Sequence, residues 1–173
     1  GASVKDVYTD QLEMQLATLN DLGRKWTVRI SREVQRCEET AKNIGTLCVE
    51  LKLAGGLDYN KVKGFKDKQK VTEDARAQFY FAVDQPFRQW LQAIDPEQDD
   101  PDEAALRWQA QARNIAEKLG KQMVMEAGNA ALKGHRIVVD KDKKTERTIL
   151  YTSPKAYNRF RTRLWEIYPK TEP

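Results

Sequence analysis

Basic residues recur at helical spacing near the C-terminus of the chain. Lys155, Arg159 and Arg163 are each four residues apart, so a helix places them in one file along its surface. Such a file suits a phosphate backbone, which presents regularly spaced negative charge. The contacts would be independent of base sequence and sensitive to salt. The alternative interpretation is a solvated helix face, which is the usual role of a file of charges.

A second basic file lies near the N-terminus. Lys25, Arg29, Arg32 and Arg36 have spacings of four, three and four, which also place them along one side of a helix. Apolar residues at threes and fours run beside this file, as they do in the C-terminal segment. The sequence therefore predicts two helices with the same layout, each with one face to bury and a neighbouring face to meet negative charge.

A third basic group lies in a lysine-rich segment that we predict to be a glycine-containing loop. Phe65 in this segment either anchors the loop onto the bundle or offers a stacking surface, and we expect the anchor. We expect three of the lysines to join the two files as candidate nucleic-acid contacts. The full candidate set is Lys25, Arg29, Arg32, Arg36, Lys61, Lys63, Lys66, Lys155, Arg159 and Arg163.

Residue patterns typical of catalysis are missing from the sequence. The single histidine, His135, lies in a charged segment where a solvated side chain is the expected reading. The chain has no Cys/His spacing typical of a metal site, no P-loop and no G-x-G-x-x-G motif. We therefore expect a protein that is not an enzyme and that has no metal and no cofactor.

The two cysteines, Cys37 and Cys48, are predicted to be buried structural thiols. If they share one helix, their separation of eleven residues amounts to about 16 Å along the axis, which a disulfide cannot span. Free thiols suit the reducing cytoplasm, which is the expected location.

Composition bounds the fold. The chain has 173 residues, 32% of them charged, with 9 Gly, 6 Pro and a net charge of +4. That length supports one domain with a real core, and the abundance of helix formers favours an all-α protein. A net charge this small is not evidence for nucleic-acid binding by itself. No apolar run is long enough to span a bilayer, so we expect no membrane partner.

Apolar periodicity and capping signals define four helices. We predict that Gly23 breaks the first and longest helix into two pieces, and that Pro86 kinks or interrupts the second. Asp100 and Pro101 give the third helix the clearest start in the chain. The expected ranges are 4–54, 72–94, 101–132 and 153–168.

The last helix and the segment before it complete the expected fold. Ala156, Phe160, Leu164 and Ile167 share the face of the last helix that should be buried. Residues 133–152 fit either a short β-hairpin excursion or a loop. The sequence thus predicts an all-α four-helix bundle with a long first helix, room for a β-hairpin excursion before the last helix, and a single domain over residues 1–173.

Several segments together resemble the C-terminal part of CasA, the large subunit of the type I-E Cascade complex of CRISPR antiviral defence. These segments are AKNIGTLCVELKLAGG at residues 41–56, VTEDARAQFYFAVDQPFRQWL at residues 71–91, and the last helix with Ala156, Phe160 and Leu164. The resemblance covers most of the chain from Ala41 onward. The segment 133–152 is longer than this resemblance would suggest.

The resemblance implies a helical bundle from the C-terminus of a larger protein. It implies a non-catalytic DNA-targeting role, with contacts to double-stranded or displaced single-stranded DNA. Other implied partners are the Cascade subunits with their guide RNA, especially the small subunit CasB, and the recruited helicase-nuclease. PAM recognition would belong to an N-terminal domain that is not part of this chain. The alternative is a protein-interaction bundle without direct nucleic-acid contact.

Overall fold

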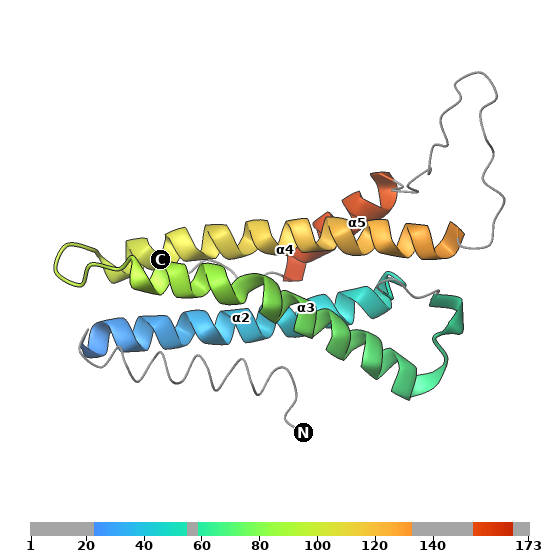
Figure 1. Cartoon of the computed structure of the whole chain (residues 1–173), viewed down its shortest axis with the longest axis horizontal. Helices are drawn as coiled ribbons and strands as arrows, with labels where there is room; N and C mark the ends of the chain where they lie inside the picture. The colour runs from blue at the N-terminus through green and yellow to red at the C-terminus, as the bar shows by residue number, and fades with distance from the viewer. Residues whose placement is uncertain (1–22, 55–58, 133–153, 168–173) are drawn as a thin grey trace, which may run out of the picture.

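Four helices pack together in the computed structural model of the chain (Figure 1). The structure describes residues 23–54, 59–132 and 154–167. The helices are α2 (Arg24–Glu50), α3 (Gly64–Gln92), α4 (Pro101–Leu132) and α5 (Pro154–Ile167), with a short 3-10 helix η2 (Tyr59–Lys61) before α3. The described part contains no strand, which confirms the predicted all-α class. The proposed β-hairpin excursion lies outside the described residues.

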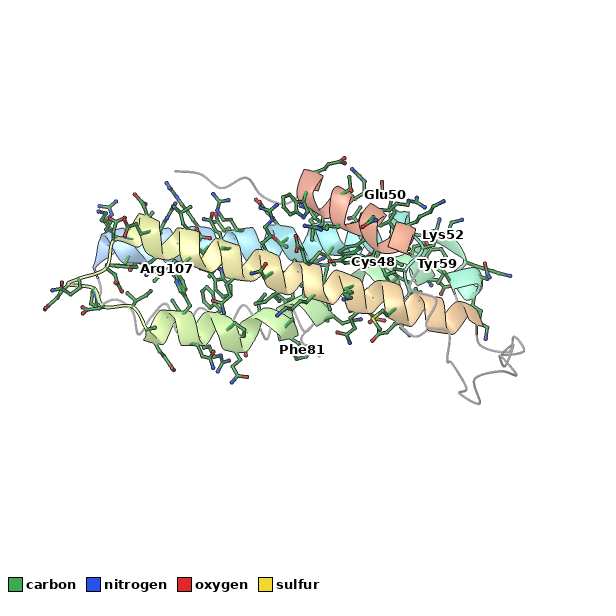
Figure 2. All side chains as sticks on the ribbon, turned by 90° about the horizontal axis from the view of Figure 1, so that it is seen from above. Cys48, Glu50, Lys52, Tyr59, Phe81 and Arg107 are labelled. Atoms are coloured by element: carbon green, nitrogen blue, oxygen red, sulfur yellow. The ribbon has the colours of Figure 1, made fainter. Side chains whose placement is uncertain are left out.

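The three long helices lie side by side, and α5 packs across α4 and α2. Glu33 contacts Gln109, and Cys48 contacts Met123, so α2 and α4 run in the same direction. Phe87 of α3 packs against Trp108 of α4, and Trp90 donates to the carbonyl of Ala104, so α3 and α4 run antiparallel. The shorter helix α5 contacts α4 and α2, and Figure 2 shows it on the opposite side of α4 from α3.

The predicted apolar faces form one core. On α2 the seam from Trp26 to Cys48 is buried, and on α5 Phe160 and Leu164 are buried as predicted. At one end of the bundle Phe87, Trp90 and Trp108 form an aromatic cluster, in which the Phe87 and Trp108 rings meet edge to face with centroids 5.1 Å apart. The core joins elements that are distant in sequence.

Two helix boundaries confirm the capping analysis. Helix α4 begins at Pro101, where a carboxylate oxygen of Asp100 accepts a hydrogen bond of 3.1 Å from the backbone N–H of Glu103. Helix α2 begins directly after Gly23, whose φ of 91° is in the region that favours glycine. The predicted helix before Gly23 lies outside the described residues.

The predicted end of the first helix is wrong by four residues. Helix α2 ends at Glu50, and Lys52 adopts the left-handed conformation with φ 58°. The backbone N–H of Leu53 then donates to the carbonyl of Cys48 at 2.8 Å, and the Leu53 side chain is buried. This hydrogen bond and the buried leucine close the helix four residues before its predicted end at residue 54.

The predicted start of the second helix is also wrong. Helix α3 begins at Gly64, so much of the expected lysine-rich loop is helical and Thr72 is an interior residue. The side chain of Asp67 accepts a hydrogen bond of 2.9 Å from the backbone N–H of Lys63, which satisfies a donor at the helix start. The helix also runs through Pro86 without interruption.

Two glycines permit close helix contacts. At Gly45 of α2, an added Cβ would lie 2.7 Å from both the side-chain methyl and the backbone carbonyl of Thr72 on α3. At Gly120 of α4, it would overlap the ring of Phe160 on α5. Glycine is required at these positions because a neighbouring helix occupies the space of a side chain.

Gly45→Ala is expected to lower the free energy of unfolding by about 1–3 kcal/mol, because the obstructing atoms include backbone of α3. Thr46→Ala is the control, since Thr46 is exposed and its hydroxyl bonds only within α2, to the carbonyl of Lys42. Urea unfolding of both variants measures the difference. Equal stability of the two variants would contradict the close packing of α2 on α3.

Gly120→Ala tests the packing of α5 against α4. We expect a loss of about 1–3 kcal/mol in the Phe160 background, because the new methyl group competes with the ring for space. In a Phe160→Ala background the same change should be neutral, or stabilising by up to about 1 kcal/mol through helix propensity. A urea double-mutant cycle measures this coupling, and additive effects would rule out the contact.

Candidate nucleic-acid interface

The N-terminal basic file is divided by the fold. Lys25 and Arg32 are exposed on α2. Arg29, in contrast, is only 5% exposed, and its Nε lies 3.5 Å from the carboxylate of Asp102 at the start of α4. The Arg36 side chain is also largely covered, with its Nε 3.7 Å from Glu33. The helical spacing is as predicted, but two of the four basic residues, Arg29 and Arg36, are covered and lie beside carboxylates.

A buried carboxylate explains this division. Glu33 is fully buried between α2 and α4, and its Oε1 accepts a hydrogen bond of 2.8 Å from the side-chain amide of Gln109. Arg29 and Arg36 stand one turn to either side of Glu33 on α2 and supply compensating positive charge. Sequence reasoning missed this network. The available signal was an acidic residue at position 33, in register with the apolar seam of α2.

Burial raises the pKa of Glu33 above its ordinary value. The hydrogen bond from Gln109 and the charges of Arg36 and Arg29 act in the opposite direction, but desolvation is the larger effect.

The two cysteines, Cys37 and Cys48, are buried and free, as predicted. Burial raises the pKa of each thiol to about 12, so both stay protonated near neutral pH and neither supplies a thiolate nucleophile.

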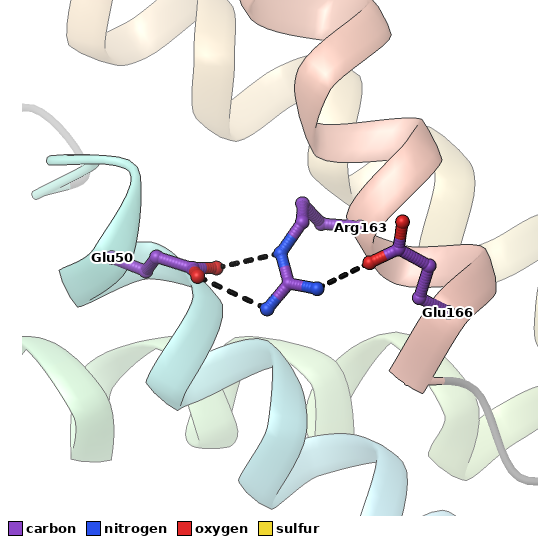
Figure 3. A network of polar contacts seen from close by, with 3 residues as sticks. All are labelled: Glu50, Arg163 and Glu166. Atoms are coloured by element: carbon purple, nitrogen blue, oxygen red, sulfur yellow. Dashed lines mark hydrogen bonds and ion pairs between the residues drawn. The ribbon is translucent and has the colours of Figure 1, made fainter.

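The C-terminal file is also divided. Lys155 and Arg159 are exposed on α5, whereas Arg163 binds Glu50 at the end of α2 (Figure 3). Its Nε and one terminal nitrogen each donate to a carboxylate oxygen of Glu50 at 3.0 Å, and the other terminal nitrogen donates to Glu166. These hydrogen bonds raise the pKa of Arg163. Arg163 therefore serves as a link between α5 and α2.

The lysine-rich segment is the most exposed basic group. Lys61 lies in η2, Lys63 precedes α3 and Lys66 lies in its first turn, and all three side chains are exposed. Phe65 between them is 81% exposed, so the expectation that it anchors the segment onto the bundle is wrong. The early start of α3 accounts for this, because it directs Phe65 away from the core.

The fold brings two of the three basic groups toward one end of the bundle. Arg163 ties α5 to Glu50, and the chain then passes through Lys52 and Tyr59 into the lysine-rich segment (Figure 2). Lys25 lies 25 residues before Glu50, about 37 Å along α2 at 1.5 Å per residue. The two predicted files therefore do not merge into one surface.

Charged side chains from two helices surround Trp165. Its indole N–H donates to Glu117 of α4 at 2.7 Å, and its ring lies 3.3 Å below the guanidinium carbon of Arg113. Arg161 lies on the same ring at 5.4 Å and pairs with Glu117 at 3.9 Å. Trp165 and Arg161 both belong to α5, and tertiary packing brings Arg113 and Glu117 of α4 to them.

The described residues contain no group of three or more His, Cys, Asp and Glu side chains placed to hold a metal ion. None of the described helices is long and apolar enough to cross a membrane. His135 lies outside the described residues.

The raised pKa of Glu33 predicts a pH-dependent contribution to stability. The folded protein binds this proton more tightly than the unfolded chain, so the contribution is largest below the ordinary pKa of 4.5 and falls as pH rises through the folded value. The stability advantage of the parent over Glu33→Gln should therefore shrink from pH 4.5 to pH 8. Urea unfolding across this range measures it, and an advantage that grows with pH would refute the assignment.

The comparisons with known proteins yield one match. The family model described as CRISPR-associated protein Cse1 (CRISPR_cse1) matches residues 1–119. No curated protein and no solved structure matches the chain. Because the family match covers more than half of the 173 residues, the chain belongs to the CRISPR-associated Cse1 family, whose role is that of a subunit of the Cascade complex.

Proposed function

We propose that this chain is a non-catalytic helical bundle from the C-terminus of a larger Cse1 protein, and that it holds the DNA backbone through exposed basic side chains. Family membership supports a role within Cascade. The resemblance of residues 41–56 and 71–91 to the C-terminal part of CasA supports the assignment to that region. The four-helix architecture agrees with both.

The observation that carries this proposal is the set of exposed cations toward the C-terminal end of α2. Lys155 and Arg159 lie on α5, and Lys61, Lys63 and Lys66 lie around the start of α3. Among the described residues, no ion pair engages any of these five side chains. Phosphate contacts here would release counterions without first breaking an internal pair.

The remaining candidates differ in what binding would cost them. Arg29 would have to leave a buried site beside Asp102, and Arg163 would have to leave Glu50. A buried charge that loses its partner is strongly destabilising, so we assign Arg29 and Arg36 a structural role. Lys25 and Arg32 remain exposed, but at the opposite end of α2.

Backbone contacts of this kind position DNA without reading its sequence. In an RNA-guided complex the guide supplies sequence specificity by base pairing, while the protein holds backbone and shape. The bundle would grip double-stranded or displaced single-stranded DNA. It would also dock beside the small CasB subunits and help to present the surface that recruits the helicase-nuclease, as the resemblance to CasA implies.

DNA binding by the assembled complex tests the proposal. Lys155→Ala with Arg159→Ala, and separately Lys61→Ala with Lys63→Ala and Lys66→Ala, should weaken the affinity for DNA of any sequence. The slope of log affinity against log salt should fall by about 0.9 for each duplex phosphate contact that is lost. Gel-shift titration at several salt concentrations measures both effects.

The charge-matched control is Lys25→Ala with Arg32→Ala, which removes two exposed cations from the other end of α2. It should bind DNA like the parent complex. If all three variants bind DNA with the parent affinity and salt slope, the basic side chains have no role in DNA binding. The protein-interaction bundle would then be the better description.

A further inference from the structure

A groove of about 520 Å³ lies between α4 and α5, away from the lysine-rich segment. Its walls include Leu106, Ala110, Arg113 and Glu117 from α4, with Arg161 and Trp165 from α5. It combines exposed apolar side chains with guanidinium groups that contact an aromatic ring.

The apolar part of the groove is exposed. Leu106 is 40% exposed and Trp165 is 49% exposed, whereas the large apolar side chains of Trp108 and Leu164 are buried in the core. Ala110 lies one helical turn after Leu106 on α4 and is also exposed. Exposed tryptophan and leucine on adjoining helices form a surface that loses unfavourable hydration when a partner covers it.

The charged part of the groove is preorganised. Arg113 stacks on the Trp165 ring at 3.3 Å, and Arg161 lies 5.4 Å from the same ring. Glu117 already accepts the indole N–H of Trp165 and pairs with Arg161. A guanidinium group that stacks on an aromatic ring is held in place by its flat face. Its N–H groups, at the edge, stay available to hydrogen-bond acceptors.

We propose that this groove docks a protein segment in which a carboxylate side chain stands beside an aliphatic one. The carboxylate binds the N–H edges of Arg113 and Arg161, and the aliphatic side chain covers Leu106, Ala110 and the open part of the Trp165 ring. Tryptophan and arginine are among the residue types enriched at the hot spots of protein interfaces. The inference depends on family membership and is independent of the DNA contacts proposed above.

The geometry argues against two other occupants. On the ring face that Arg113 covers, a nucleobase could stack on Trp165 only by displacing that guanidinium, which lies at van der Waals distance from the ring. A phosphate backbone would leave Leu106 uncovered. A basic segment would face two guanidinium groups against a single carboxylate, Glu117, that is already engaged.

Site-specific photo-crosslinking identifies the occupant. The photo-reactive amino acid benzoylphenylalanine replaces Ala110 inside the groove, in the chain co-expressed with the other Cascade subunits and a guide RNA. Gln111 is the matched control position, since it is exposed on α4 but does not line the groove. After irradiation, mass spectrometry identifies the cross-linked segment.

We expect a cross-link from position 110, at least tenfold above position 111, to a protein segment that contains Asp or Glu within four residues of Leu, Ile or Val. Arg113→Gln and Arg161→Gln should each reduce the cross-linking yield by about tenfold, since each removes guanidinium N–H donors that would bind the partner's carboxylate. Both changes leave the core contacts of Phe160 and Leu164 intact. Lys118→Ala, which removes one exposed charge from α4 outside the groove, should leave the yield unchanged.

Three results would overturn the inference. A cross-link to nucleic acid would show that the groove binds the other class of macromolecule. A cross-link to a segment without acidic residues, or a yield that the two arginine substitutions do not alter, would exclude the carboxylate contact. A yield at position 110 no higher than at position 111 would mean that nothing docks in the groove.

Discussion

The contact between Phe160 and Gly120 determines where α5 lies. The ring fills the space that a side chain at position 120 would take, so α5 can approach the backbone of α4 closely. The bidentate pair between Arg163 and Glu50 then ties α5 to the end of α2. Both proposed surfaces depend on this placement, because α5 contributes Lys155 and Arg159 to one and Arg161 and Trp165 to the other.

Residues with the same charge and spacing acquire different roles in this fold. Arg29 and Arg36 stand on either side of buried Glu33, and Arg29 also pairs with Asp102 of α4, whereas Arg32 between them is exposed. The angular position around α2 decides this, because only two of the three point toward α4. A file of basic residues on an amphipathic helix is therefore a mixture of structural and surface charges, and burial separates the two.

Capping signals in the sequence predicted a helix start correctly where neighbouring residues agreed with them, and incorrectly where neighbouring residues indicated a different start. Asp100 and Pro101 marked the start of α4 correctly because capping and proline geometry act over a few residues. The predicted start of α3 at residue 72 was wrong, because Thr72 lies inside the helix. The hydrogen bond from Lys63 to Asp67 allowed helix to form eight residues earlier, within a segment whose glycine and lysines had indicated a loop.

The sequence by itself determined the all-α class, the apolar faces of the helices and the two files of basic residues. It could do so because helical periodicity is a property of neighbours along the chain. The tertiary structure alone decided which arginines are buried, that the two files lie at opposite ends of α2, and that Arg113 and Glu117 meet Trp165. Those outcomes depend on contacts between residues as many as 113 positions apart, such as Glu50 and Arg163, and helix spacing does not specify them.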